Sequence, residues 1–240
     1  MLGMLSHGVP RRRFVALPAY ILTGFLGSPA VQAEDFSVGT SVVQVHALPS
    51  RGGRVMLGSG VVMEGRKVVT NCHILREAAA VAFSKGALRF SVSGVRADVF
   101  HDLCLLEVPT LTVSAARLGD AGKLRKGDSI SLFGFPRAVG TSLSRSIGKV
   151  TGLFFYQGGR LIQTSAYFAE GSSGGGVFDD SGKLVGISTF FSREHLRKYF
   201  AIPVNWISGT LRKSEKPVQP LKGIPFWADP QRRPSFLRIR

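Results

Sequence analysis

Short runs rich in β-branched and other apolar residues recur along most of the chain, and each is bounded by glycine or by charged residues. Such runs are typical of β-strands joined by tight turns, and many of them at short spacing predict a barrel or a sandwich. Helical periodicity is scarce, so we expect only one short helix, over 203–211. The expected strands cover residues 40–47, 54–63, 67–71, 79–84, 88–100, 103–108, 128–134, 144–153, 160–165, 174–179, 183–190 and 198–202.

The first 33 residues carry a different pattern. Three arginines at 11–13 precede an apolar run that is too short to span a bilayer, and Val31 and Ala33 are small residues at positions that a signal peptidase reads. This segment is therefore predicted to be a secretory signal peptide, with a mature chain that begins near Glu34. The arginines fit a Sec signal and a twin-arginine signal equally well. No other run predicts a transmembrane segment.

The strongest candidate for chemistry is a glycine-rich turn at 170–176, with the sequence Glu-Gly-Ser-Ser-Gly-Gly-Gly. A serine hydroxyl becomes a useful nucleophile only when a base takes its proton and donors meet the developing oxyanion. Glycines let the backbone turn sharply enough to aim two N–H groups at one point. His73, Asp102 and Ser173 follow one another in an order that Ser-His-Asp triads are known to use.

Residues 55–207 resemble a trypsin-like (chymotrypsin-fold) serine protease, and the bacterial Deg/HtrA branch most closely. The shared motifs occur in the family's order and at about its intervals. They are Gly-Ser-Gly-Val-Val at 58–62, Thr-Asn-Cys-His at 70–73, Asp-Leu-Cys-Leu-Leu at 102–106, Gly-Phe-Pro at 134–136, Gln-Thr-Ser-Ala at 163–166, Gly-Ser-Ser-Gly-Gly at 171–175, Leu-Val-Gly-Ile at 184–187 and Phe-Ala-Ile-Pro at 200–203.

The resemblance implies an all-β fold of two six-stranded antiparallel β-barrels, with the site in the cleft between them. The protease domain would span 34–211, with the first barrel at about 37–118 and the second at about 128–205. Only 33 residues follow Ile207, which is too few for the PDZ domain common in Deg/HtrA proteins.

The resemblance also assigns roles. Ser173 would be the nucleophile rather than its neighbour Ser172, because the family places the nucleophile directly before two glycines. His73 would be the general base, Asp102 would orient it, and the N–H groups of Gly171 and Ser173 would form the oxyanion hole. The implied activity is that of an exported serine endopeptidase acting on proteins or peptides. The alternative is an inactive protease-fold binding module that uses a basic surface.

Four residues are assigned to the primary specificity pocket by register. Tyr167 is expected near its base, and Thr189, Phe190 and Phe191 near its wall. The pocket then lacks the acid that a Lys or Arg side chain requires, so cleavage after basic residues is disfavoured. Glu170 at the rim is the one residue that could reverse this preference.

The two cysteines adjoin the predicted triad. Cys72 precedes His73 and Cys104 lies two residues after Asp102, so a contact between the triad residues would bring the sulfurs together. In an exported protein this favours a disulfide, and the alternative is a pair of buried free thiols. Two cysteines without a Cys-x-x-Cys pattern do not favour a metal site, and no cofactor is expected.

The formal net charge is +16, and removing the predicted signal takes away three arginines and no acid, which leaves +13. The charge suits binding to an acidic surface or polymer, or serves only solubility. No nucleic-acid motif is present.

Residues 212–240 hold five prolines and eight Lys or Arg against two acids, with interspersed aromatic residues. This tail is interpreted as a docking segment, as an extended segment along the barrel surface, or as a disordered end.

Overall fold

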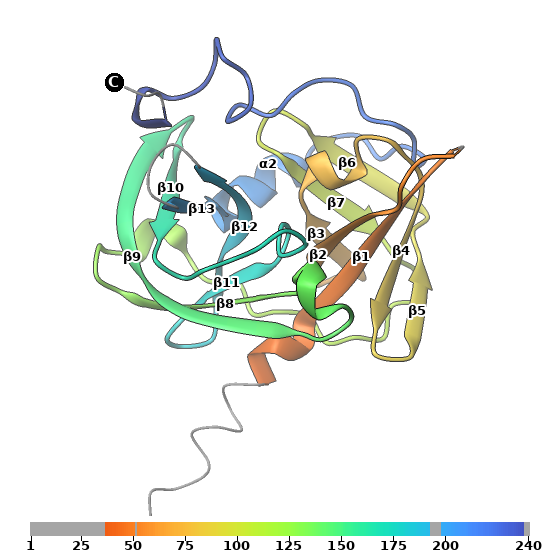
Figure 1. Cartoon of the computed structure of the whole chain (residues 1–240), viewed down its shortest axis with the longest axis horizontal. Helices are drawn as coiled ribbons and strands as arrows, with labels where there is room; N and C mark the ends of the chain where they lie inside the picture. Colours follow the sequence, from red (N-terminus) through yellow and green to blue (C-terminus); the bar gives the residue numbers. More distant parts are fainter. Residues whose placement is uncertain (1–36, 51, 193–197, 238–240) are drawn as a thin grey trace, which may run out of the picture.

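Two antiparallel β-units account for most of the regular structure, as the short apolar runs predict (Figure 1). The computed structural model describes residues 37–50, 52–192 and 198–237, and the predicted signal peptide lies outside them. The all-β, two-unit architecture is confirmed. None of the helices within these ranges has the length and apolarity that a membrane span requires.

The first unit is a seven-stranded sheet in the order β5-β4-β1-β2-β3-β7-β6. It differs from the expected six-stranded barrel because the single strand predicted over 88–100 is broken. Val92 donates its N–H to Val81 of β4 and Ser93 donates to Glu107 of β7, so the chain changes partner strand at this point. The strands are β1 (Val42–Pro49), β2 (Met56–Met63), β3 (Lys67–Thr70), β4 (Ala78–Lys85), β5 (Leu88–Ser91), β6 (Gly94–Asp98) and β7 (Leu103–Glu107).

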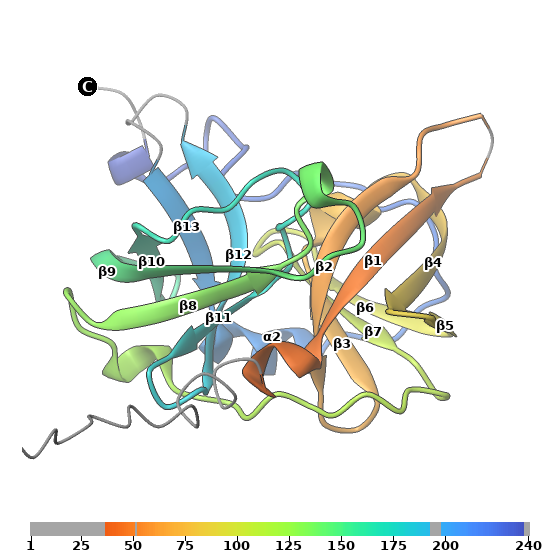
Figure 2. The ribbon, with the colours of Figure 1, turned by 60° about the horizontal axis from the view of Figure 1, so that its bottom comes forward.

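The second unit is the closed six-stranded barrel that was expected, in the order β10-β13-β12-β11-β8-β9. The expected terminal helix is also present, as α2 (Ile207–Leu211) after a short 3-10 turn. Figure 2 shows the two units side by side, with α2 near their junction. The strands are β8 (Ser129–Gly134), β9 (Ser144–Tyr156), β10 (Gly159–Thr164), β11 (Gly176–Asp179), β12 (Leu184–Ser192) and β13 (Lys198–Pro203).

Buried side chains of the described residues form three apolar clusters. One lies among the strands of the first unit and one inside the second barrel. The third takes residues from both units and from the tail, including Val61, Leu103, Phe133, Phe200 and Phe226. Burial of apolar surface across the junction therefore fixes the two units against each other, and with them the residues that meet there.

Residues 212–237, here called the C-terminal strap, first follow the edge of the first unit. Lys216 exchanges two backbone hydrogen bonds with Val95 of β6, at N–O distances of 2.8 and 2.9 Å. The Glu215 carboxylate lies 3.0 Å from the guanidinium of Arg96. The strap thus covers a strand edge that would otherwise present unpaired backbone groups.

The strap then returns to the second barrel, as the blue trace in Figure 1 shows. The Phe226 N–H donates to the carbonyl of Phe100 at 2.9 Å, and the Phe226 ring is fully buried. Farther on, Phe236 stacks on Phe154 of β9 with ring centroids 4.4 Å apart. These contacts make the strap part of the packed molecule and carry it past the junction of the two units.

A disulfide between Cys72 and Cys104 joins the loop after β3 to β7, with the two Cα atoms 5.0 Å apart. Both residues are buried in the core of the first unit. The bond closes a loop with a sequence separation of 32 residues. Closing a loop of this size stabilises the folded chain by about 3–4 kcal/mol in the chain-entropy description.

Candidate active site

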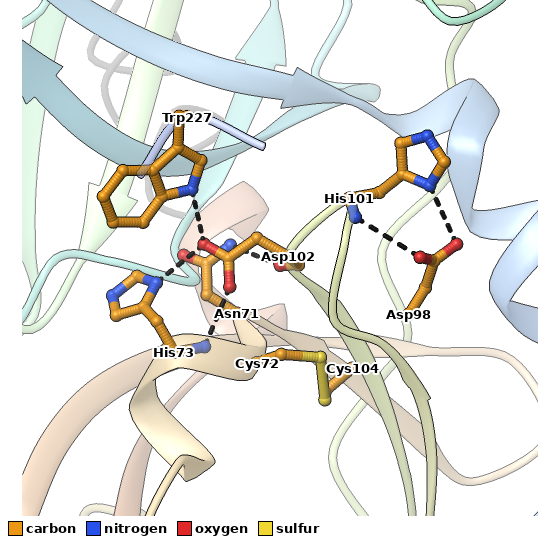
Figure 3. Close-up of a disulfide and its surroundings, with 8 residues drawn as sticks. All are labelled: Asn71, Cys72, His73, Asp98, His101, Asp102, Cys104 and Trp227. Atoms are coloured by element: carbon orange, nitrogen blue, oxygen red, sulfur yellow. Dashed lines mark hydrogen bonds and ion pairs between the residues drawn. A yellow bond between two sulfur atoms is a disulfide. The ribbon is translucent and has the colours of Figure 1, made fainter. Parts of the chain in front are cut away.

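His73 and Asp102 are brought into direct contact beside the disulfide (Figure 3). His73 lies on a short 3-10 helix, Cys72–Leu75, and Asp102 directly precedes β7. The Asp102 carboxylate accepts the His73 backbone N–H at 2.8 Å through Oδ1 and meets the ring Nδ1 at 2.7 Å through Oδ2. A carboxylate accepts hydrogen bonds, so Nδ1 carries a proton and the neutral ring presents an unprotonated Nε2.

The two residues of this pair differ in their exposure to solvent. The Asp102 side chain has no exposed surface, whereas 25% of the His73 side chain is exposed. Asp102 also has a φ of +59°, a left-handed conformation that is costly for a residue with a side chain. Its carbonyl accepts the Asn71 side-chain amide at 3.0 Å and the Cys72 N–H at 3.3 Å, and these bonds hold the backbone there.

A third donor to the carboxylate comes from the C-terminal strap. The indole Nε1–H of Trp227 donates to Asp102 Oδ2 at 3.0 Å, as Figure 3 shows. The aromatic residues of this segment are visible in the sequence, but none of them is predicted to belong to the site. No local motif could have indicated the contact, because it joins positions 125 residues apart.

Ser173 lies on the sharp turn that the glycines predict. Gly174 follows it with a φ of +84°, and a Cβ at this position would overlap the carbonyl oxygen of Ser59. The Ser173 hydroxyl donates to the carbonyl of Thr189 on β12 at 3.2 Å rather than to His73. Catalytic hydrogen bonds in enzymes without substrate are often long or misaligned. A rotation about χ1 of Ser173 would release the hydroxyl from the Thr189 carbonyl.

Two N–H groups of the turn are left free for a ligand. Among the described residues, Ser172, Gly174 and Gly175 donate to protein carbonyls, whereas Gly171 and Ser173 donate to no protein group. These are the two residues that the sequence predicts as oxyanion donors. Two free donors on one turn suit a developing negative charge.

The loop after β8 orients the Gly171 N–H. The Arg137 N–H donates to the Glu170 carbonyl at 2.8 Å. In a trans peptide the N–H points opposite to the carbonyl, so this bond turns the Gly171 N–H away from Arg137. Ser59 of β2 adds a second bond, from its hydroxyl to the Gly171 carbonyl at 2.8 Å. Ser59 belongs to the Gly-Ser-Gly-Val-Val motif at 58–62, but the motif does not predict this role.

The four predicted pocket residues have different neighbours. Tyr167 is 56% exposed and contacts Tyr199 edge-on, with ring centroids 5.4 Å apart. Thr189 is buried and donates its hydroxyl to the Ile187 carbonyl. Phe190 is buried and stacks on both Phe200 and Trp227. The side chain of Phe191 lies outside the described part of the chain. These contacts do not enclose Tyr167 as a pocket base, so the assignment stays a prediction.

A second His–Asp pair lies nearby but faces away from the first, as Figure 3 shows. His101 Nδ1 lies 2.9 Å from Asp98 Oδ2, and the His101 ring packs against Trp206. Burial alone would raise the pKa of Asp98, but hydrogen bonds from His101 and the charges of His101 and Lys213 hold that pKa below its ordinary value. The pair is a structural link between the end of β6 and the loop before β7.

No group of three or more His, Cys, Asp or Glu residues within the described ranges is arranged to hold a metal ion. The site holds a histidine–carboxylate pair, a serine on a glycine turn and two free backbone donors. Together these can take a proton from a hydroxyl, attack a carbonyl carbon and stabilise the resulting oxyanion.

The sequence is similar to a known protein family and to several named proteins. A family model described as "Trypsin-like peptidase domain" matches residues 58–187. Serine endoprotease DegS of Haemophilus influenzae is 31% identical over 179 residues, covering 70% of this chain and 52% of that protein. Periplasmic serine endoprotease DegP of Escherichia coli is 31% identical over 162 residues, covering 63% of this chain and 34% of that protein. The chain thus spans about half, or less, of the length of these relatives.

Solved structures support the same fold. A structure titled "HtrA-type protease AlgW with tripeptide" superposes with a TM-score of 0.67 and 26% identity, covering 75% of this chain and 62% of that one. The active form of the Rv3671c protease from M. tuberculosis gives a TM-score of 0.69 over 90% of this chain and 97% of that chain. Its identity is 22%, so it supports the fold alone.

Proposed function

Because the chain belongs to the trypsin-like peptidase family, we propose that it is a serine endopeptidase that hydrolyses peptide bonds through an acyl-enzyme. The observation that carries the proposal is the two-point contact of His73 with the buried Asp102 carboxylate, at 2.8 and 2.7 Å. Burial of a carboxylate without partners is unfavourable, and two of the hydrogen bonds that Asp102 accepts orient the partly exposed imidazole of His73.

The first half of the reaction forms the acyl-enzyme. Ser173 Oγ attacks the carbonyl carbon of the substrate while His73 Nε2 takes its proton. The carbonyl oxygen becomes an oxyanion that accepts from the N–H groups of Gly171 and Ser173. One such donor stabilises the transition state by about 3 kcal/mol. Asp102 stabilises the imidazolium, which then gives its proton to the leaving amine.

The second half returns the free enzyme. Water replaces the leaving amine beside His73, which takes a proton from it as the water oxygen attacks the acyl carbon. Collapse of the second tetrahedral intermediate breaks the ester bond, and the proton on His73 returns to Ser173 Oγ. The carboxylic acid product leaves, and every residue of the site recovers its initial state.

The competing hypothesis is a protease fold that binds but does not cleave. The free N–H groups at Gly171 and Ser173 favour catalysis, since a binding module has no use for two unpaired donors on the turn that carries the candidate nucleophile. A fluorophosphonate probe separates the two, because it forms a covalent bond only with an activated serine. We expect the protein to be labelled at Ser173, as read by intact mass and peptide mapping. Absence of labelling in a folded protein would support the binding module.

We also propose that the enzyme prefers small or medium aliphatic residues before the scissile bond. Tyr167 cannot provide a buried acid for a Lys or Arg side chain. Glu170, the one acid near the rim, already pairs with Arg137 at 3.1 Å. A peptide library ranked by kcat/KM should therefore disfavour Lys and Arg. Neighbouring aliphatic residues should differ in a graded way, because one methylene is worth about 1–3 kcal/mol in an apolar pocket. Dominant cleavage after Lys or Arg would contradict the pocket assignment.

Export is the third part of the proposal. Its support is the predicted signal peptide, the Cys72–Cys104 disulfide, and the relative whose name describes it as periplasmic. Disulfides persist in oxidising compartments such as the bacterial periplasm and are rare in the cytosol.

A further inference from the structure

The Asp102 carboxylate is held by donors from two distant parts of the chain. His73 supplies its backbone N–H and its ring Nδ1, and Trp227 of the C-terminal strap supplies the indole N–H. The indole bond and the imidazole bond end on the same oxygen, Oδ2. Removal of the indole would therefore alter the atom that orients the catalytic ring.

The Trp227 ring is fixed in this position by its own packing. It stacks on Phe190 with centroids 5.1 Å apart and an interplanar angle of 19°. Its plane meets the His73 ring edge-on, with centroids 5.6 Å apart. The preceding residue, Phe226, is fully buried and bonded through its N–H to Phe100. The indole is thus preorganised as a donor rather than a surface ring that happens to lie nearby.

The Thr189 hydroxyl is not available to replace the indole. Thr189 lies close to the pair, but its hydroxyl donates to the Ile187 carbonyl at 2.9 Å and accepts from the Asn71 amide at 3.1 Å. The Asn71 amide also donates to the Asp102 backbone carbonyl rather than to the carboxylate. Among the described residues, Trp227 is therefore the sole donor to the carboxylate outside His73.

We propose that Trp227 is a positioning residue for catalysis, so that the C-terminal strap completes the active site. The inference rests on the proposed peptidase function. The indole N–H fixes the rotation of the Asp102 carboxylate and withdraws part of the negative charge from Oδ2. Without it, the carboxylate orients the imidazole less precisely and attracts the imidazolium more strongly.

The exchange Trp227→Phe tests this, because it removes the donor and keeps an aromatic ring for Phe190. We expect kcat to fall about tenfold, because one hydrogen bond to a charged group contributes free energy of that size. KM should stay within about twofold of the parent value. The acid limb of the kcat/KM profile should move to higher pH, because the less neutralised carboxylate favours protonated His73. Arg76 is the charged residue that lines the same cavity of about 60 Å³ as His73 and Trp227 in the described part of the chain, and it is unchanged in the variant.

Trp206→Phe is the matched control. The Trp206 Nε1 is buried and has no hydrogen-bond partner among the described residues, so the same exchange there removes an indole N–H without breaking a described hydrogen bond. This variant should keep the position of the acid limb. If Trp227→Phe does not fold, β-(3-benzothienyl)alanine at position 227 replaces the N–H with sulfur in a ring of nearly the same shape.

A readout that does not need turnover separates this inference from the proposed function. In a Ser173→Ala background, the Nδ1 proton of His73 should give a downfield ¹H NMR resonance that shifts or broadens when Trp227→Phe is added. An unchanged resonance, or an active Trp227→Phe variant with the parent pH profile, would overturn the positioning role. An unmodified protein that neither hydrolyses peptides nor reacts with the fluorophosphonate would overturn the peptidase proposal instead.

Discussion

Replacement of Ser173 by alanine is expected to abolish peptide hydrolysis while leaving the fold intact. The exchange removes only the Oγ atom, whose one hydrogen bond is a 3.2 Å contact with the Thr189 carbonyl. Loss of the nucleophile should lower kcat by about 10⁴-fold or more, since the remaining rate then comes from the oxyanion donors and substrate binding alone. Steady-state hydrolysis of a peptide substrate measures this, and a thermal melt verifies the fold.

Ser172→Ala is the matched control for that prediction. Ser172 is adjacent in sequence and buried, and its backbone N–H donates to Ala169. The Ser172→Ala variant should retain hydrolysis within about tenfold, because no catalytic step uses this hydroxyl.

A second test adds His73→Ala to Ser173→Ala. Triad members act as a unit, so the double variant should be little worse than either single one. Residual turnover in Ser173→Ala that the double variant lacks would exclude Ser173 as the nucleophile.

Asp102→Asn should lower kcat by about 10⁴-fold, because an amide cannot hold the imidazole in the tautomer that presents an unprotonated Nε2. The carboxylate accepts from both the His73 N–H and the Trp227 indole, so the amide also meets two donors with only one oxygen. The effect should fall on kcat rather than on KM. Retention of a tenth or more of the parent kcat would show that His73 does not depend on this carboxylate.

The neighbouring Asp98 provides a control with the same change of charge. Asp98→Asn should keep hydrolysis within a few-fold while lowering the free energy of unfolding at neutral pH. The pKa of Asp98 lies below its ordinary value of 3.8, so its charged form stabilises the folded state above that pH. This contribution is lost as the pH falls through the lowered pKa. The stability difference between the parent and Asp98→Asn should therefore shrink in acid.

The sequence predicts the strands, the double-unit fold and the contact of His73 with Asp102. Each depends either on a local residue pattern or on the order of motifs along the chain. Apolar runs mark strands, and the histidine, aspartate and serine motifs keep their order along the chain. The break at Val92–Ser93 was missed because both flanking segments have strand character, and only pairing with different partners separates β5 from β6. The separation is thus a property of tertiary contacts rather than of local propensity.

Trp227 and Ser59 were missed for a related reason. The Ser59 hydroxyl reaches Gly171 across 112 positions, and the indole reaches Asp102 across 125. A side chain that acts at such separations has no periodicity or neighbour that reveals its partner. The tail could be recognised as aromatic and basic from its composition, but its path along both units depends on where β6 and β9 place their edges.

The path of the strap also bears on when the molecule could become active during its biosynthesis. A growing chain of about 211 residues would already hold His73, Asp102 and Ser173, together with every strand of both units. It would still lack the indole that reaches Oδ2 and the bridge from Lys216 to Val95 at the free edge of β6. Full catalytic competence would then arrive only once residue 227 has emerged and docked. By the roughly tenfold effect expected for the indole, an unfinished chain would hydrolyse peptides more slowly than the finished enzyme.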